Sequence, residues 1–203
     1  MLDNMHFYDF MHKQILVVIA LFAGTGIGYL YIGGLYSSSF VPELLWFSLV
    51  LVLSFWGYRL HRVFLVYDLN MQEKEEWLGQ LRYFLFSYFS VWTIMFLIYT
   101  SRSDMELHYV AIATQLGVTV VSATILASQK KLAAFTLVTL MLPLTFYFIL
   151  VGEFYSYLLA FFTIVLSGVL LYAAHNTFNY LIKIQYQAYH DALNNLGNRR
   201  YFI

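Results

Sequence analysis

The sequence predicts an all-α membrane protein that forms a bundle of six transmembrane helices. The residues AVILMFWYC make up 61% of the 203 residues and the charged residues only 11%, whereas a soluble domain is about 25% charged. Six runs are long and apolar enough to cross a bilayer, which takes about 20 residues; they are 14–36, 42–60, 80–100, 107–127, 132–151 and 154–182. No run alternates polar and apolar residues as a transmembrane strand does, so the spans are predicted to be helices.

The composition also excludes several classes of protein. The formal net charge is zero and the chain has no cysteine. A soluble enzyme, a disordered linker, a basic nucleic-acid-binding protein and a disulfide scaffold are therefore excluded. Zinc or iron–sulfur ligation by cysteine is excluded as well. The lipid bilayer is the expected partner, and no nucleic acid is expected.

The distribution of positive charge predicts the orientation of the spans. Arg102 is the only Lys or Arg on one side of the predicted membrane. An even number of spans places both termini on the other side, together with Lys13, Arg59, Arg62, Lys74, Arg82, Lys130, Lys131, Lys183, Arg199 and Arg200. Because cytoplasmic loops carry the excess of Lys and Arg, both termini are predicted to be cytoplasmic.

The segment 1–13 is predicted to be an interfacial helix that lies against the membrane surface. It mixes acidic and aromatic residues such as Asp3, Phe7 and Asp9. It lacks the basic start and the small-residue cleavage site of a signal peptide. Residues 14–182 are then one transmembrane domain.

Small residues stand four apart in the first span, at Ala20, Gly24 and Gly28. Such a ridge lets another helix approach closely in lipid. Packing within the bundle is the expected use of this ridge, and contact between two protomers is the alternative.

Acidic residues gather on the predicted outer side. Asp104, Glu106 and His108 border the fourth span, and they could meet Glu43 at the start of the second span and Glu153 in the last connection. A solvated acidic rim is the expected role. Carboxylates with an imidazole can also bind a divalent cation or a polyamine, or titrate with pH, so this possible outer cluster is the alternative.

A ligand pocket is predicted beside Pro143, which removes a backbone hydrogen bond from the fifth span and is expected to kink it. The kink leaves space next to bulky neighbours. Aromatic residues of three spans and one histidine are candidate lining residues: Trp92, Phe96, Tyr99, Pro143, Phe146, Tyr147, Phe161, Phe162 and His175. The alternative is that these aromatics only fill the bundle or its interfacial belts.

Two histidines lie at a similar predicted depth, His61 in the second span and His175 in the sixth. Polar groups at such a depth usually face the protein interior or a partner. A hydrogen-bonded or signal-relaying histidine is expected at His175, and His61 is expected to lie near Arg59 and Arg62. Haem ligation by the two imidazoles is the alternative.

The end of the sixth span carries a heptad-like pattern. A spacing of three and four residues connects Tyr172, His175, Asn179, Ile182, Tyr186, Tyr189 and Leu193. This spacing is typical of a short parallel coiled coil, so the chain is predicted to form a parallel homodimer along this helix. A single amphipathic helix on the membrane surface is the alternative.

The chain ends with the run His190-Asp191-Ala192-Leu193-Asn194-Asn195-Leu196-Gly197-Asn198-Arg199-Arg200. This run resembles the opening motif of GGDEF-type diguanylate cyclase domains, D-x-L-T-G-L-x-N-R-R. The family positions are matched by His190, Asp191, Leu193, Leu196, Asn198, Arg199 and Arg200. Asn194, Asn195 and Gly197 depart from the motif, although asparagine still suits a turn there.

The resemblance implies that residues 191–203 begin a cyclase domain and that 183–190 extend a signalling helix into it. In that family the metal-binding carboxylates, the guanine contacts and the G-G-D-E-F loop lie further along. No catalytic residue and no cofactor are therefore expected in these 203 residues, which are expected to be part of a longer protein. GTP and magnesium are expected only in the missing domain, where two GTP molecules become cyclic di-GMP and two pyrophosphates.

The preceding residues are similar in layout to the membrane-associated sensor (MASE-type) domains of such cyclases. The similarity covers six short-looped helices, the stretch 126–135 between the fourth and fifth spans, Leu142-Pro143 and a last helix that leads to the motif. It implies a multi-pass protein of the bacterial inner membrane. A similar layout occurs in six-helix histidine kinases that sense quorum signals.

The function implied is that of a transmembrane sensory input domain. It is expected to bind a small, rather apolar signal and to control the dimer arrangement of the cyclase. The alternatives are a constitutive membrane anchor and dimerisation domain without a ligand, or a quorum-signal receptor-like domain. A transporter is disfavoured, because no acidic residue lies in the middle of a span.

Overall fold

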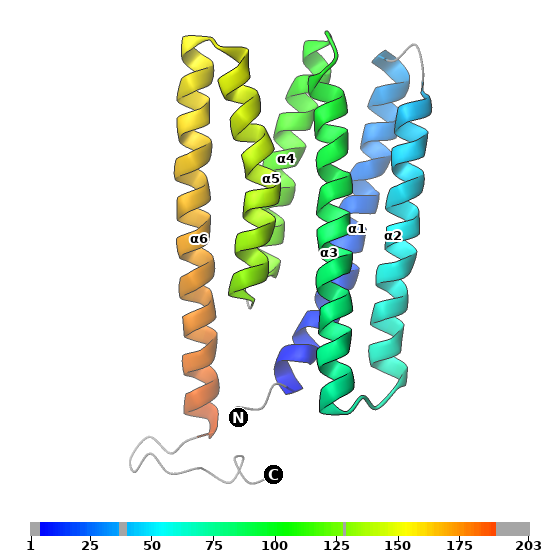
Figure 1. Ribbon diagram of the computed structural model, residues 1–203, viewed down its shortest axis with the longest axis vertical. Coiled ribbons are helices and arrows are strands. Elements are labelled where there is room, and N and C mark those ends of the chain that lie inside the picture. The colour runs from blue at the N-terminus through cyan, green and yellow to red at the C-terminus, as the bar shows by residue number, and fades with distance from the viewer. Residues whose placement is uncertain (1–4, 37–39, 128, 190–203) are drawn as a thin grey trace.

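The computed structural model describes residues 5–36, 40–127 and 129–189, which form six helices (Figure 1). The helices are α1 (Met5–Tyr36), α2 (Val41–Val66), α3 (Met71–Thr100), α4 (Met105–Ile125), α5 (Lys130–Val151) and α6 (Phe154–Tyr189). The start of α1 and the end of α6 lie at the same end of the bundle (Figure 1). We call this the proximal end. The distal end holds the connections α1–α2, α3–α4 and α5–α6.

All six helices are long and apolar enough to cross a membrane, and the described residues contain no strand. The expected all-α class and the six expected spans are therefore confirmed. Four helix ends extend well beyond the apolar runs: the starts of α1 and α3 and the ends of α2 and α6. The reason at the start of α3 is a capping box, in which Asn70 accepts from the backbone of Glu73 and Glu73 accepts from the backbone of Asn70.

Helix α3 lies at the centre of the bundle. It contacts α1, α2, α4 and α5, and it is the most buried of the spans. Helix α6 is the least buried span, and among the described residues it contacts only α5 and α4. The architecture is thus a five-helix body around α3, with α6 attached to one side (Figure 1).

An aromatic cluster forms the centre of this body. The Trp92 side chain of α3 is fully buried, with its ring centroid 4.8 Å from that of Phe22, 5.3 Å from Tyr29 and 5.7 Å from Trp46. The indole nitrogen of Trp46 donates to the carbonyl oxygen of Val91 at 2.7 Å. Edge-to-face and tilted contacts of this kind add stabilisation beyond the buried area, so α1, α2 and α3 are joined mainly through rings.

The segment 5–13, expected as a separate interfacial helix, is the beginning of α1. Tyr8 is buried, and its ring meets that of Trp77 edge to face. The His12 ring stacks on His61 with centroids 5.2 Å apart, and the Nδ1–H of His61 donates to the His12 carbonyl at 3.0 Å. These contacts with α2 and α3 explain why the helix continues without a break.

The connection between α5 and α6 is short because of Gly152. This residue has φ 77°, and it is the one glycine with positive φ among the described residues. Such a left-handed conformation at the end of a helix favours glycine, which has no Cβ. The turn sends α6 back along α5, and it forms part of the distal end.

The ridge of small residues in α1 does not face the bundle interior. Gly24 and Gly28 are exposed, and a Cβ built on either would meet nothing within 4 Å. Close packing occurs instead at Gly57 of α2. A Cβ there would lie 2.5 Å from Cζ of Phe84 and 3.0 Å from Cδ1 of Ile19, so Gly57 is the position where a small residue lets α1, α2 and α3 come together.

We therefore expect Gly57→Ala to destabilise the bundle by about 1–3 kcal/mol, because the buried Phe84 ring has no free space to move into. Thermal unfolding of the purified chain in detergent measures the effect. Gly79→Ala is the matched control, because its Cβ would meet nothing within 4 Å. An equal melting temperature for the two variants would contradict the packing assigned to Gly57.

Candidate functional site

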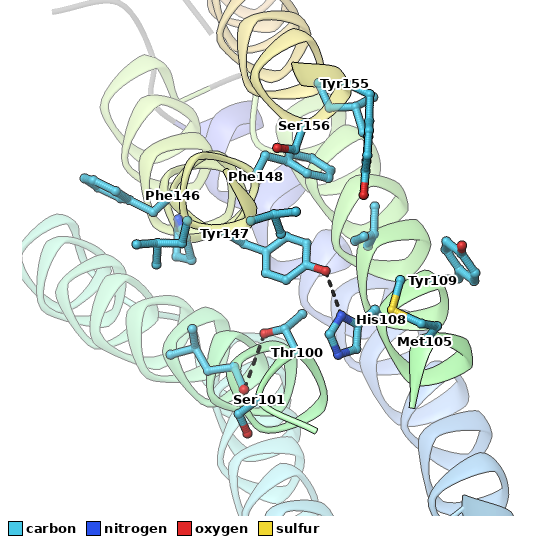
Figure 2. Close-up of a pocket in the computed structure, with 16 residues that line it drawn as sticks. Thr100, Ser101, Met105, His108, Tyr109, Phe146, Tyr147, Phe148, Tyr155 and Ser156 are labelled. Atoms are coloured by element: carbon cyan, nitrogen blue, oxygen red, sulfur yellow. Dashed lines mark hydrogen bonds between the residues drawn. The ribbon is translucent and has the colours of Figure 1, made fainter. Parts of the chain in front are cut away.

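A pocket of about 830 Å³ opens at the distal end of the bundle, between α3, α4, α5 and α6 (Figure 2). Pockets that bind small molecules commonly have volumes of roughly 300–1,000 Å³ and mostly apolar walls with a few polar groups. The lining follows this pattern; it consists of Leu97, Thr100, Ser101, Met105, His108, Tyr109, Ile112, Pro143, Phe146, Tyr147, Phe148, Leu150, Val151, Tyr155, Ser156 and Leu159.

Helix α5 provides more of the lining residues than any other helix. Pro143 lies inside the helix, where it cannot donate the usual backbone hydrogen bond. The two halves of α5 lean in different directions in Figure 1. The half that follows Pro143 carries the wall residues Phe146, Tyr147 and Phe148, so the sequence of α5 accounts for their placement.

The polar part of the wall is a chain of hydrogen bonds that runs from α5 to the α3–α4 connection. The Tyr147 hydroxyl lies 2.7 Å from Nδ1 of His108 (Figure 2). Nε2 of the same ring lies 2.6 Å from the Arg102 carbonyl oxygen. A carbonyl only accepts, so Nε2 carries the hydrogen. In the neutral ring Nδ1 then accepts from the Tyr147 hydroxyl.

The Arg102 side chain is directed away to a buried carboxylate. Its Nη2 lies 2.8 Å from Oε1 of Glu43, whose side chain is fully buried at the start of α2. The guanidinium also lies over the Tyr99 ring, 5.4 Å from the centroid. Gly33 makes room for this arrangement, because a Cβ there would lie 2.6 Å from Cγ of Glu43. The ion pair thus connects α1, α2 and α3 behind the pocket.

The remaining small hydroxyl groups of the wall donate to their own helices or turns. Thr100 donates to the Phe96 carbonyl at 2.8 Å, and Ser101 donates to the Ile98 carbonyl at 2.8 Å. Hydroxyl hydrogens in a dry bundle are commonly satisfied in this way. Their oxygen atoms keep lone pairs that can accept further hydrogen bonds.

Three of the candidate pocket residues line the pocket: Pro143, Phe146 and Tyr147. Three others do not line the pocket and are fully buried in the bundle: Trp92, Phe96 and Tyr99. Phe96 supports the wall, with its ring 6.0 Å from that of Tyr147. The Tyr99 hydroxyl donates to the Tyr29 carbonyl at 2.6 Å. The central place of α3 explains the burial of its aromatic residues.

The other three candidates do not line the pocket. Phe161 and Phe162 are more than half exposed on the outer side of α6. His175 lies near the proximal end, where its Nε2 accepts from Nδ2 of Asn179 at 2.9 Å. His175 and His61 are not brought together, because α2 and α6 do not contact one another within the described part of the chain.

The acidic residues of the distal end do not form a metal site. The described residues contain no group of three or more His, Asp or Glu side chains that could hold a metal ion. Glu43 pairs with Arg102, and His108 bonds to Tyr147 and to a backbone carbonyl. Glu106 and Glu153 are exposed, and Asp104 is partly exposed at the start of α4.

The predicted dimer seam follows α6 towards its end. Tyr172 and Asn179 are exposed. Ile182, Tyr186 and Tyr189 belong to the last turns of α6, where the structure describes the helix but not these side chains. Leu193 and the motif residues His190, Asp191, Leu196, Asn198, Arg199 and Arg200 lie outside the described residues, so the motif remains a prediction.

Sequence reasoning missed the lining residues at the helix ends, such as Thr100, Met105, Tyr109, Tyr155 and Leu159. A signal for them was available. Arg102 is the one predicted outer cation and lies between two of these residues. A single cation among several acids indicates a specific ion pair, which would have pointed to the α3–α4 connection.

These features define a class: a polytopic, all-α membrane protein with a mostly apolar pocket, which carries a few polar groups, at one end of a six-helix bundle. Comparison of the chain with protein-family models, with curated proteins and with solved structures found no match. The pocket, its polar wall and the long helix α6 are the features from which a function can be inferred.

We expect Arg102→Gln to lower the stability of the bundle by about 3 kcal/mol, because it leaves the buried Glu43 carboxylate without its counter-ion. Adding Glu43→Gln should restore most of the loss, since no buried charge then remains. Unfolding in detergent measures both variants. Arg62→Gln, at an exposed position of α2, is the control and should change little. A double variant as unstable as the sum of both single variants would contradict the pairing.

Proposed function

We propose that this bundle is a transmembrane sensory input domain. A small amphipathic ligand binds in the distal pocket, and α6 carries the change to a diguanylate cyclase domain that begins at residues 191–203 and makes cyclic di-GMP from GTP. The observation that carries the proposal is that α6 both lines the pocket and leads towards the motif. The protein lies in the bacterial inner membrane, with both termini in the cytoplasm.

The position of α6 supports this coupling. Tyr155, Ser156 and Leu159 lie in its first turns and line the pocket. The helix then runs to Tyr189 over 36 residues, a length of about 54 Å at 1.5 Å per residue. The described part of α6 contacts only α5 and α4 and is the least buried span, so α6 is the helix to which we assign the movement.

A ligand shifts such an equilibrium only by its difference in affinity for the two arrangements. The pocket lies between α6 and the helices α3, α4 and α5. Movement of α6 changes the shape of the pocket, so a bound molecule favours one position of α6 over another. In a parallel dimer this movement changes the pairing of Ile182, Tyr186 and Tyr189, and brings two GTP-bound cyclase domains together or apart.

Filling the pocket tests the proposal. Leu159→Trp places a large side chain in the pocket wall, and it should change the cyclic di-GMP level at least fivefold, in either direction. The measurement is made in a bacterial strain without other diguanylate cyclases. The gene is expressed with all the coding sequence that lies in frame with this chain.

Leu158→Trp is the matched control, because Leu158 is exposed on α6 and does not line the pocket. It should leave the cyclic di-GMP level unchanged at equal protein abundance. A wild-type chain that makes no cyclic di-GMP contradicts the cyclase assignment. Unchanged levels in both variants favour a constitutive anchor without a ligand.

The dimer seam has a separate test. The double variant Tyr186→Asp with Tyr189→Asp puts charges into the proposed seam, so it should convert dimers to monomers and abolish cyclic di-GMP synthesis. Crosslinking in membranes and size measurement in detergent report the oligomeric state. Asn176→Asp, at an exposed position of the same helix that the seam pattern does not include, should leave the dimer intact. Dimers that persist in the double variant would contradict the proposed seam.

A further inference from the structure

We propose that the distal pocket selects an organic ammonium, that is, an amine with an apolar chain, over a carboxylate or an alcohol with the same chain. This inference rests on the proposed function, because it names the chemical class of the ligand for that pocket. Two independent properties of the site carry it: the direction of its hydrogen bonds and the sign of the charge around it.

The hydrogen bonds of His108 and Tyr147 use their hydrogens on acceptors of the protein rather than on the pocket. Nε2–H of His108 must donate to the Arg102 carbonyl, because that oxygen has no hydrogen. When Nδ1 carries no hydrogen, the Tyr147 hydroxyl donates its hydrogen to that nitrogen. What Tyr147 has left for a ligand is the lone pairs of its oxygen. A hydroxyl that donates a hydrogen bond becomes a stronger acceptor at its own oxygen.

The hydroxyl groups at the end of α3 that line the pocket also donate their hydrogens to the protein. Thr100 and Ser101 both use their hydrogens on backbone carbonyls of α3, and both lie at the pocket beside His108 and Tyr147 (Figure 2). These oxygens can accept but have no hydrogen left to donate. An ammonium group has three donors and no acceptor, so it matches this set, whereas a carboxylate has acceptors only.

The charge around the site favours the same ligand. Arg102 is the one Lys or Arg at the described distal end, and Glu43 binds its guanidinium behind the wall. The other charged groups of that end are Asp104, Glu106 and Glu153. Asp104 and Glu106 flank Met105, which lines the pocket. An anionic ligand therefore meets net negative charge at this end, while a cationic ligand is attracted.

The rings at the rim complete the site. Tyr109 and Tyr155 line the pocket and are each about 60% exposed or more. An ammonium near the face of a tyrosine ring is attracted by the negative charge density of the ring. The apolar chain of the ligand has Leu97, Ile112 and Leu159 to contact. The pocket thus offers acceptors for the head and apolar surface for the tail.

Three probes that differ only in their head groups test the inference: n-octylamine, n-octanol and n-octanoate. Each is titrated at pH 7 into the purified chain in lipid nanodiscs of zwitterionic lipid, and empty nanodiscs are subtracted. Isothermal titration calorimetry gives the dissociation constants. The amine should bind at least tenfold more tightly than the carboxylate, and more tightly than the alcohol.

Tyr147→Phe removes the acceptor oxygen and keeps the ring, so it should weaken octylamine binding about tenfold, as expected for a hydrogen bond to a charged group. Thr100→Val is the second variant, because it keeps the shape and leaves His108 and Tyr147 in place; it should weaken octylamine binding several-fold. Tyr83→Phe is the matched control, since Tyr83 is exposed on α3 outside the pocket. It should change nothing.

Equal binding of the three probes, or tighter binding of octanoate, overturns the inference. So does octylamine binding that neither Tyr147→Phe nor Thr100→Val weakens. The sensor function fails in a different way. If octylamine binds selectively and the cyclic di-GMP level in cells does not respond to it or to Leu159→Trp, the proposed ligand class is supported and the proposed signalling function is contradicted. If octanoate binds and changes that level, the signalling function is supported and the selectivity for an ammonium is contradicted.

Discussion

Polar hydrogens inside an apolar bundle must find an acceptor within the protein, because the surrounding lipid offers none. The helices meet this constraint mostly by themselves. Thr25 and Thr119 each donate to the carbonyl four residues earlier at 2.6 Å, and Ser167 does so at 2.7 Å. The indole hydrogens of Trp46 and Trp77 go to backbone carbonyls of neighbouring helices. Thr100 and Ser101 at the distal pocket follow the same pattern, so they present oxygen lone pairs to the cavity.

The fold class and the number of spans could be predicted from composition and from the length of the apolar runs, because the thickness of the bilayer fixes both. The central place of α3 could not be predicted. The hydropathy of α3 is the same as that of α2 and does not set it apart, and lipid-facing and buried aromatics look alike in a sequence. Trp92 and Phe161 were thus equivalent candidates, although one is in the aromatic core and the other faces outward.

The candidate site was only partly predictable for a related reason. Pro143 marks the helix whose following residues line the pocket, and its effect is local in the sequence. The ion pair of Arg102 with Glu43 joins the α3–α4 connection to the first turn of α2, which is distant in the chain, so the sequence shows an excess of acids but not which acid has a partner. The spacing of residues along one helix does not contain this information.

The peripheral attachment of α6 also has a consequence for biosynthesis. The first five helices contain the aromatic cluster, the buried ion pair and the contacts of α3, and all of them leave the ribosome before α6. A compact body can then assemble in the bilayer while the last span is still in the insertion machinery. Such a body already contains α4 and α5, the two helices that α6 contacts.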